Sequence, residues 1–470
     1  MIIKQFYLDC LAHASYIVVD EASGRAVVID PRRDVQQYLD AADELGASIE
    51  AVLLTHFHAD FVAGHLELRE RVGAWIGLGA RGAAEYDVRA LHEGDVIELG
   101  DARLSILETP GHTPEGISIV ATDAGADPAV PVAVFTGDTL FVGDVGRPDL
   151  LASAGVTSDE LAGWLYDSLH DKLLALPDAT TVYPAHGAGS LCGKNLGKET
   201  FSTIGEQRRG NYALQPMSKA EFKAIVTEAQ PEVPGYFVHD VMLNKSERPT
   251  LDATLPRTLK PLTPEDVEEA VSGGAVVVDT RESSDFLDGH LPGSLNVGLA
   301  GKFATWAGTL LRPDQRIVIL AAPGKEEESA VRLGRIGLDG VVGFVDGGPG
   351  ALSARSLIPA TSVRALESEL QGSKDLQVLD VRTAREWEGG HVEGSLNIPL
   401  NQLQRRIAEV PRDRPLAVVC KSGYRSSAAC SVLACAGVGD LRNVTGGMDA
   451  WTAEALPVTA SVDAAGSCSA

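Results

Sequence analysis

Short apolar runs that end at polar or glycine-rich turns recur along the first half of the chain. The runs Ser15–Val19 and Arg25–Ile29 are rich in β-branched residues and predict two strands. The spacing of apolar residues from Val35 to Leu45 predicts a helix. The uninterrupted apolar run Ala51–Leu54 predicts a buried strand. Strands and helices mixed in this way are typical of layered α/β domains, so we expect one α/β domain over residues 1–245.

A polar stretch punctuated by prolines separates this half from the rest of the chain. Asn244–Thr250 is polar, and Pro256, Pro261 and Pro264 follow it closely. Such a composition is typical of linkers. We therefore expect a domain boundary after residue 245.

Beyond this boundary the chain repeats itself. The run Val278–Asn296 matches Leu379–Asn397 at one constant offset, with Asp, Arg, Gly-His and Gly-Ser-Leu-Asn in the same places. This repeat predicts two tandem α/β modules, over residues 255–358 and 362–460. The small polar stretch Ser461–Ala470 is expected to be a frayed tail.

Length, charge and cysteine usage narrow the class of protein. A chain of 470 residues fits about three domains. Its formal charge of −25 argues against nucleic acid or an anionic membrane as a partner. The N-terminus lacks the pattern of a signal peptide and no long apolar run follows, so we expect a cytoplasmic enzyme without a membrane partner. The six cysteines are scattered and form no CxxC pair, which argues against a disulfide framework.

Histidines and aspartates cluster just after predicted strands. His56, His58 and Asp60 follow the run Ala51–Leu54 directly, and Phe61 comes next. Farther along, each of three further residues follows a strand-like run beside a glycine or proline turn: His112, Asp138 and His186. Loops at strand ends carry function, and such an arrangement suits ligands that converge on one edge of a sheet.

These four blocks, in this order, resemble the metallo-β-lactamase superfamily over residues 1–245, which implies an αββα sandwich that binds metal. In hydrolytic members the last histidine of the first block helps to hold a second metal. Phe61 occupies that position here and has no lone pair, so we expect one metal. The remaining pattern is similar to the persulfide dioxygenase branch of the superfamily. This resemblance places the iron ligands on His56, His112 and Asp138.

Two histidines and one carboxylate form a facial triad that leaves positions on Fe(II) for O₂ and a substrate. The resemblance therefore implies one Fe(II) per chain. It also places Arg147 in the arginine region of the branch, where its side chain could fix an anionic thiol substrate. His58, Asp60 and His186 would then orient the ligands or a metal-bound water.

A three-histidine zinc site is the main alternative. His56, His58 and His112 would hold the zinc, and the activity would be thioester hydrolysis of the glyoxalase II type. Phe61 is the feature that argues against it. The other histidines lack such surroundings and are expected to be structural: His13, His65, His92, His170 and His239.

Only one cysteine has the surroundings of a nucleophile. Cys420 follows the apolar run Leu416–Val419 and precedes a helical pattern that continues from Ala428 to Ala436. Backbone N–H groups and the positive end of a helix stabilise a thiolate in that place. Arg425 would add a positive charge for an anionic sulfur donor such as thiosulfate. Cys430 and Cys435 lie within the predicted helix and are expected to pack.

The spacing C-x-x-G-x-R, with the upstream repeat blocks, resembles the rhodanese family over residues 362–460. The resemblance implies sulfur transfer through Cys420. It also implies that the following loop surrounds the transferred sulfur: Lys421, Ser422, Gly423, Tyr424 and Arg425.

The first repeat departs from this pattern. Its loop holds no cysteine and contains three consecutive acids, Glu326–Glu328, which would repel an anionic donor or simply begin a helix. We therefore expect a catalytically silent rhodanese-like module that packs between the active domains or at a subunit interface.

Together the resemblances imply oxidation of a low-molecular-weight thiol persulfide by O₂ to sulfite and free thiol. The rhodanese module would pass sulfur between thiosulfate, or a persulfide, and an acceptor thiol, with sulfite as the second product or partner. The thiol carrier stays open among glutathione, coenzyme A, bacillithiol and mycothiol, as does the direction of sulfur transfer. Related enzymes lead us to expect a homo-oligomer, such as a dimer.

Overall fold

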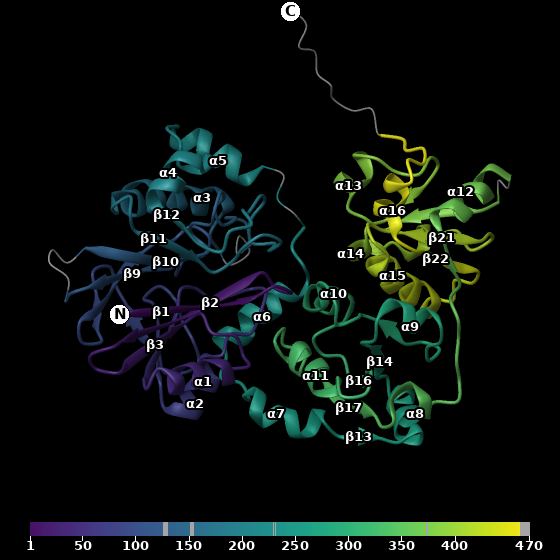
Figure 1. Cartoon of the computed structure of the whole chain (residues 1–470), viewed down its shortest axis with the longest axis horizontal. Coiled ribbons are helices and arrows are strands. Elements are labelled where there is room, and N and C mark those ends of the chain that lie inside the picture. Colours follow the sequence, from purple (N-terminus) through teal and green to yellow (C-terminus); the bar gives the residue numbers. More distant parts are fainter. Residues whose placement is uncertain (126–129, 151–154, 229, 231, 373–374, 461–470) are drawn as a thin grey trace, which may run out of the picture. The chain divides into compact units, whose positions relative to one another are not determined.

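The computed structural model describes residues 1–460 except 126–129, 151–154, 229, 231 and 373–374 (Figure 1). The expected frayed tail, Ser461–Ala470, lies outside the described residues. The chain divides into two compact units. The first comprises Met1–Thr254 with the short segment Gly334–Gly337, and the second comprises Leu255–Leu333 with Leu338–Ala470.

The described part of the first unit contains two six-stranded mixed sheets. In the first sheet, β1 to β3 are antiparallel and β3 to β6 are parallel. In the second sheet all neighbours are antiparallel except β10 and β11. The first sheet has the order β1 (Ile2–Leu8), β2 (His13–Asp20), β3 (Arg25–Ile29), β4 (Ser48–Leu54), β5 (Trp75–Gly79) and β6 (Arg89–Leu91). The second has the order β12 (Ser202–Thr203), β11 (Thr181–Pro184), β10 (Pro131–Gly137), β9 (Ile117–Asp123), β8 (Ala102–Glu108) and β7 (Val96–Glu98).

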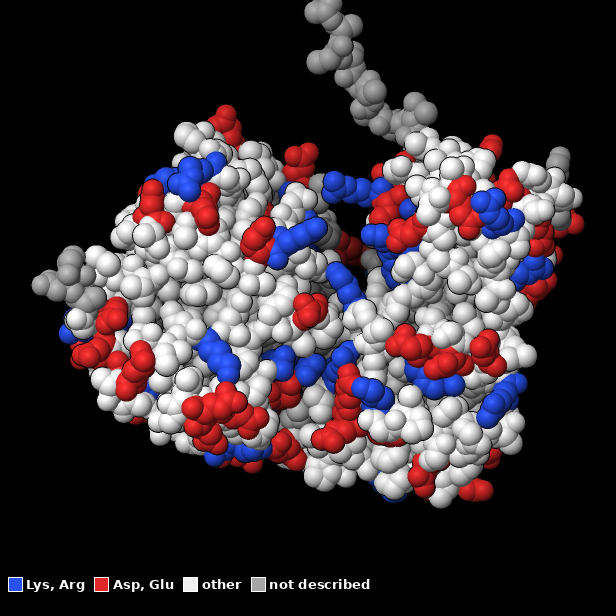
Figure 2. Space-filling model, in the orientation of Figure 1, with Lys and Arg blue, Asp and Glu red and all other residues white. Residues whose placement is uncertain are grey.

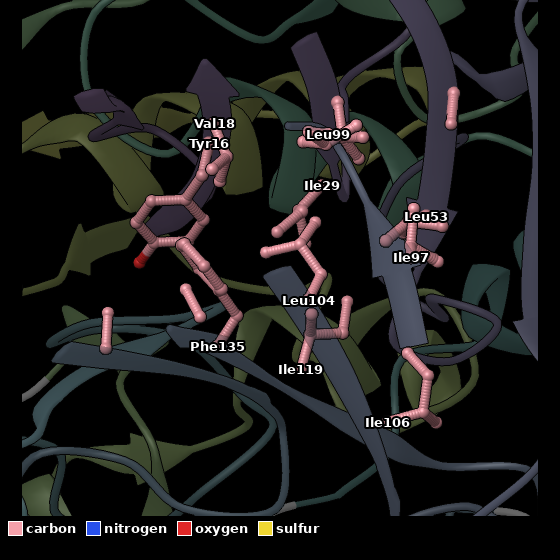
Figure 3. Packing of buried hydrophobic residues seen from close by; sticks show 14 of the residues in the cluster. Tyr16, Val18, Ile29, Leu53, Ile97, Leu99, Leu104, Ile106, Ile119 and Phe135 are labelled. Atoms are coloured by element: carbon pink, nitrogen blue, oxygen red, sulfur yellow. The ribbon is translucent and has the colours of Figure 1, made fainter. Parts of the chain in front are cut away.

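The main core lies between these two sheets (Figure 3). Tyr16 and Leu53 come from the first sheet, and Leu104 and Phe135 come from the second. Residues alternate along a strand, so Leu53 faces the second sheet while its neighbour Val52 is buried on the opposite face. Burial on both faces explains why β4 is an uninterrupted apolar run.

Helices cover the outer face of each sheet (Figure 1). α1 and α2 contact β4. Apolar residues of α3, α4 and α5 form a second core with β9, β10 and β11. The order helix, sheet, sheet, helix confirms the predicted αββα sandwich. The helices of this part of the chain are α1 (Gln36–Glu44), α2 (His65–Val72), α3 (Ser158–Asp167), α4 (Ile204–Gly210), α5 (Lys219–Thr227), α6 (Tyr236–Lys245) and α7 (Leu251–Thr258).

Part of the stretch predicted to be a linker is buried. Asn244 ends up at the C-terminal turn of α6, Thr250 directly precedes α7, and both are buried together with Arg248. Arg248 forms an ion pair of 2.7 Å with the buried Glu67 of α2. Glu247 and Pro249 of the same stretch are exposed. The stretch predicted to be a linker is therefore only partly packed, and its composition does not reveal which of its side chains are buried.

Two five-stranded parallel sheets form the described part of the second unit, as the repeat predicts. The sheet of the first module has the order β13 (Pro261–Leu262), β17 (Val341–Val345), β16 (Ile317–Leu320), β14 (Val276–Asp279) and β15 (Leu295–Asn296). The sheet of the second has the order β18 (Ala360–Thr361), β22 (Leu441–Val444), β21 (Leu416–Val419), β19 (Gln377–Asp380) and β20 (Leu396–Asn397). Their helices are α8 (Pro264–Ser272), α9 (Ser283–Leu287), α10 (Phe303–Leu310), α11 (Glu326–Gly334), α12 (Val363–Gly372), α13 (Ala384–Glu388), α14 (Leu400–Leu403), α15 (Tyr424–Cys435) and α16 (Gly447–Ala453).

The repeated residues perform the same structural task in both modules. Arg281 pairs with Asp279 at 2.6 Å and donates to the carbonyl of Gly289 at 2.9 Å. Arg382 pairs with Asp380 at 2.7 Å and donates to the carbonyl of Gly390 at the same distance. The repeated residues therefore stabilise the fold of each module. They are present in both modules, although only the second has the cysteine.

Figure 2 shows acidic and basic side chains interspersed over the face in view, on a chain with a net charge of −25. Among the described residues, no helix combines the length and the apolar character that crossing a membrane requires.

Replacing Phe135 by alanine is expected to lower the free energy of unfolding of the sandwich by about 3–5 kcal/mol, because it removes an aromatic ring from the core between the sheets. Val132→Ala on the same strand is the control, since Val132 is 37% exposed. Denaturant unfolding followed by circular dichroism measures both changes. Equal losses from the two variants would contradict the placement of this core.

Candidate metal centre and sulfur site

The first candidate site begins at the loop that leaves β4. Thr55, the first residue after β4, donates to Asp30 through its backbone N–H at 2.8 Å and through its hydroxyl at 2.7 Å. The same hydroxyl lies 3.0 Å from Nδ1 of His56. This buried network fixes the start of the loop and orients the first histidine.

The structure brings His56, His112 and Asp138 together. Oδ2 of Asp138 lies 3.8 Å from Nε2 of His56 and 3.3 Å from Nε2 of His112, and all three residues are buried. One possible ligand atom from each lies within 4.8 Å of the others. Two donors bound to one ion at about 2.1 Å lie roughly 3.0–3.5 Å apart at angles near 90–110°. The distance from His112 to Asp138 lies within this range and the distance from His56 to Asp138 is 0.3 Å above it, so the trio is close to the spacing for a single metal ion.

The protonation and hydrogen bonding of this trio also fit a metal. Burial lowers the pKa of both histidines, that of His56 well below 6.5. Neutral imidazoles are the form that ligates metal. Nδ1 of His112 donates to the carbonyl of Arg147 at 2.9 Å, which turns Nε2 toward Asp138. Neither carboxylate oxygen of Asp138 has a hydrogen-bond donor in the described part of the chain, and a buried carboxylate needs a partner.

A narrow pocket opens onto this trio. Its remaining lining is small and uncharged, and consists of Thr55, Thr109, Thr113, Gly116, Ile117 and Thr139. The trio is thus the part of the cluster that lines the pocket. His58, Asp60 and His186 do not line this pocket.

His58, Asp60 and His186 form a second buried group that could hold a metal. Nε2 of His186 lies 3.5 Å from Asp60, and Nε2 of His58 lies 3.1 Å from Asp30. Burial opposes protonation of His186, but the carboxylates of Asp138 and Asp60 outweigh it and raise its pKa well above 6.5. From the sequence we expected these three residues to surround the metal ligands. His58 lies beside His56, and His186 lies between Asp138 and Asp60.

Phe61 packs beside this second group. Its ring centroid lies 4.4 Å from that of His58 and 4.0 Å from that of His13, and the side chain is fully buried. The position of a possible metal-binding histidine is therefore filled by an apolar ring. Three possible donors nevertheless stay together without it, so the expectation of a single metal stays a prediction.

Arg147 acts through its backbone and not from the pocket. Its guanidinium is buried and pairs with Asp149 at 2.7 and 2.8 Å, while its carbonyl holds His112. The preceding Gly146 must be a glycine, because a Cβ there would lie 1.9 Å from the carbonyl oxygen of Asp138. The structure therefore gives Arg147 a partner that competes with the anionic substrate expected from the sequence.

Asn244 is a site residue that the sequence did not reveal. Its amide donates to the carbonyls of His58 and Phe61, both at 2.8 Å, and accepts from the N–H of Ala63 at 2.8 Å. One buried side chain thus holds three backbone groups of the metal loop. It lies in the polar stretch that suggested a linker, and nothing nearby in the sequence indicates its role.

The second candidate site surrounds Cys420, which directly follows β21 and is buried. The N–H of Gly423 donates to its Sγ at 3.1 Å, and the hydroxyl of Ser426 lies 3.5 Å away. Gly423 adopts a φ of +109°, which favours glycine, and precedes the first turn of α15. The N–H group and the helix end stabilise negative charge on this sulfur.

Arg425 is paired within its own module. Its guanidinium forms two hydrogen bonds of 2.7 and 2.8 Å with Glu386 of α13. Burial favours the neutral acid, but Arg425 outweighs it and lowers the pKa of Glu386 to about 2. The positive charge of Arg425, which we expected to attract an anionic sulfur donor, is therefore compensated by the carboxylate of Glu386. Lys421 and Ser422 of the same loop are exposed, whereas Tyr424 is half-buried.

The corresponding loop of the first module leads into α11. Glu326–Glu328 occupy the first turn of this helix, where acids favour the helix dipole. Lys325 pairs with Glu328 at 2.8 Å. No cysteine lies in this loop, as the sequence already showed.

Comparison with protein families divides the chain in the same way. Residues 8–186 match the metallo-beta-lactamase superfamily, and residues 263–354 and 362–454 each match the rhodanese-like domain. The mitochondrial persulfide dioxygenase of Mus musculus is 30% identical over 220 residues, which cover 46% of this chain and 76% of that protein. The chain belongs to the metallo-β-lactamase superfamily. It also carries two rhodanese-like domains.

Two further relatives of this metallo-β-lactamase chain bear on its function. A cytoplasmic hydroxyacylglutathione hydrolase of Arabidopsis thaliana is 35% identical over 187 residues, covering 39% of this chain and 67% of that protein. A crystal structure titled as a metallo-beta-lactamase from Staphylococcus aureus is 32% identical with a TM-score of 0.65, and the match covers 73% of this chain and 98% of that one.

Asn244→Ala is expected to weaken metal binding by the metallo-β-lactamase domain about 10- to 100-fold, because the loop that carries the ligands loses three hydrogen bonds. Competition with a coloured chelator measures the affinity. Met242→Ala on the same helix is the control, since Met242 is 56% exposed. An unchanged metal affinity of the Asn244 variant would show that the three hydrogen bonds of Asn244 do not position the metal ligands.

Proposed function

We propose that the metallo-β-lactamase domain oxidises a low-molecular-weight thiol persulfide with O₂. The reaction is RSSH + O₂ + H₂O → RSH + SO₃²⁻ + 2 H⁺. The observation that carries this proposal is the buried trio of His56, His112 and Asp138 at a narrow pocket, beside an apolar Phe61. The similarity to a persulfide dioxygenase supports it.

His56, His112 and Asp138 would hold one Fe(II). A bound Fe(II) would supply the redox chemistry for O₂, because a facial triad of protein ligands leaves coordination positions open. The chain's own residues set the geometry: the Arg147 carbonyl turns His112, and Thr55 with Asp30 fixes the loop of His56. The lining of the pocket beside the trio is uncharged, which would limit water around the reacting group.

The second rhodanese-like domain would transfer sulfur through Cys420. Its thiolate attacks the outer sulfur of thiosulfate, the S–S bond to the sulfonate breaks, and sulfite leaves with the electron pair. An acceptor thiol then removes the outer sulfur as RSSH and regenerates the thiolate. Each step is an exchange that consumes no oxidant and runs in either direction. The Gly423 N–H and the start of α15 would stabilise the persulfide anion as they do the thiolate.

Protein loaded anaerobically with Fe(II) is expected to consume one O₂ for each sulfite formed from glutathione persulfide, measured with an oxygen electrode and a sulfite assay. Asp138→Asn and His112→Ala should each abolish uptake, because each removes a proposed iron ligand. His92→Ala, outside all three groups of possible metal ligands among the described residues, is the control. Iron-loaded protein that consumes no O₂ with any of the four thiol persulfides would sink the proposal.

Cys420→Ser is expected to abolish sulfur transfer from thiosulfate to glutathione while O₂ uptake with glutathione persulfide stays within about twofold, since the two reactions use separate residues. Cys430→Ser is the matched control, because Cys430 is a buried cysteine within α15 and not a member of the loop from Cys420 to Arg425. Sulfite release from thiosulfate measures the transfer. Full transfer by the Cys420 variant would exclude this cysteine as the nucleophile.

A zinc-dependent thioester hydrolase is the second candidate. It is favoured by the second group of donors, His58, Asp60 and His186, and by the similarity to a hydroxyacylglutathione hydrolase. Two zinc ions per chain with hydrolysis of S-lactoylglutathione would support it. One iron with persulfide-dependent O₂ uptake would support the dioxygenase.

A further inference from the structure

Two of the loops that carry possible metal ligands come from different sheets. The loop of His56 follows β4 of the first sheet, and the loop of His112 joins β8 to β9 of the second. A backbone hydrogen bond of 2.9 Å, from the N–H of Ile117 to the carbonyl of Thr55, joins the two loops at one point. Both loops line the narrow pocket. Their relative position therefore sets the distance between the two histidines.

Glu115 joins the same two loops through its side chain. Its carboxylate accepts a hydrogen bond from the backbone N–H of Phe57 at 3.0 Å, and both residues are buried. Glu115 lies three residues after His112, and Phe57 lies between His56 and His58. The bond therefore connects the backbone beside one proposed ligand to a side chain from the loop of another.

Phe57 is also held through its ring. The ring is buried, and the ammonium of Lys245 lies 5.2 Å from its centroid, within the range of a cation–π contact. A buried backbone N–H needs an acceptor inside the protein. The carboxylate of Glu115 is the acceptor for Phe57.

The backbone of Glu115 is fixed by close packing. Gly79 ends β5 of the first sheet, and a Cβ at this residue would lie 2.0 Å from the carbonyl oxygen of Glu115. Only glycine permits this approach. The carbonyl of Gly116 accepts from the N–H of Thr109 at 2.8 Å, which closes the loop of His112 on itself. The Glu115 side chain thus extends from a backbone that its neighbours hold in place.

We infer that Glu115 is a positioning residue for the metal centre, which sets the spacing of His56 and His112 by holding their loops together. This inference rests on the proposed metal ligands. It adds a residue that binds no metal and lines no pocket, and whose carboxylate acts through the backbone of Phe57.

The loop after β4 is then held at three places. Asp30 accepts from Thr55 at the start of the loop, Glu115 accepts from Phe57, and Asn244 holds the second half. Of these three holding residues, only Glu115 belongs to the loop of another proposed ligand. Its loss should therefore change the geometry between two ligands.

The test uses the full-length protein with Co(II) in place of iron, because the visible absorption of bound Co(II) reports the geometry of its ligands. Glu115→Met keeps the length of the side chain and removes both the acceptor and the charge. At saturating metal its Co(II) bands should differ from those of the wild type. Its Co(II) affinity, measured by competition with a coloured chelator, should fall about 10- to 100-fold. Glu98→Met, which removes an exposed carboxylate from β7 of the second sheet, is the matched control and should behave like the wild type.

Two further variants separate the hydrogen bond from the charge. Glu115→Gln keeps an oxygen acceptor at the same reach without the charge, so it should retain the wild-type spectrum and an affinity within about threefold of the wild type. Glu115→Asp keeps the charge on a shorter side chain and should behave like Glu115→Met. Circular dichroism checks that each variant is folded, and the Gln and Asp variants decide the matter if the Met variant does not fold.

The outcomes that would overturn this role of Glu115 are specific. One is a wild-type spectrum and affinity for Glu115→Met or Glu115→Asp. The other is a loss of affinity in Glu115→Gln equal to that in Glu115→Met or Glu115→Asp.

Failure of this inference can be told from failure of the proposed reaction. Iron-loaded wild type that consumes no O₂ with any persulfide would sink the dioxygenase, while the Co(II) measurements would still decide the role of Glu115. O₂ uptake by the wild type, with Co(II) binding by Glu115→Met equal to that of the Glu98 control, would overturn the role of Glu115 alone. A wild type that binds no Co(II) would overturn both.

Discussion

The buried carboxylate of Asp138 is the constraint on which the first domain depends. It follows β10 in the second sheet, while His56 follows β4 in the first, so both sheets must deliver their strand ends to one place. A buried carboxylate without a hydrogen-bond donor is costly unless a positive charge accompanies it. A metal ion would supply that charge. Without one, the raised pKa of His186 shows that a proton on this imidazole takes part of the role.

The surroundings of Asp138 explain the roles of several residues that are not themselves possible metal ligands. Gly146 is required because the chain passes against the Asp138 carbonyl, and the following carbonyl, that of Arg147, then meets His112. Asn244, which lies 186 residues after His58, donates a hydrogen bond to the His58 carbonyl and so holds its loop in place. The metal-binding trio is therefore set by backbone contacts as much as by its own side chains.

The two modules of the second unit separate folding from chemistry. Both keep the Asp–Arg pair that reaches the Gly carbonyl, and only one keeps the cysteine loop. The repeat in the sequence therefore indicates the fold and not the presence of the cysteine. The cysteine-less copy has the same fold and contacts α15 through Asn296.

The sequence predicted what short-range patterns determine. β4 could be predicted from an apolar run, and the strand ends indicated a set of histidines and aspartates. The resemblance to the persulfide dioxygenase branch then singled out His56, His112 and Asp138 from that set. Partners that lie far apart in the chain could not be predicted. Arg425 forms hydrogen bonds with Glu386, 39 residues away, and Asn244 donates to the carbonyl of His58, 186 residues away. No local sequence pattern could predict either contact. For the same reason, composition did not reveal that Asn244, Arg248 and Thr250 are buried within the stretch predicted to be a linker.

Anomalous diffraction at the iron edge, from crystals of the protein loaded with Fe(II), would locate the metal. We expect one iron per chain, ligated by Nε2 of His56, Nε2 of His112 and a carboxylate oxygen of Asp138, with His58, Asp60 and His186 beside it. A second metal ion held by His58, Asp60 and His186, or iron ligated by His58 instead of Asp138, would contradict it.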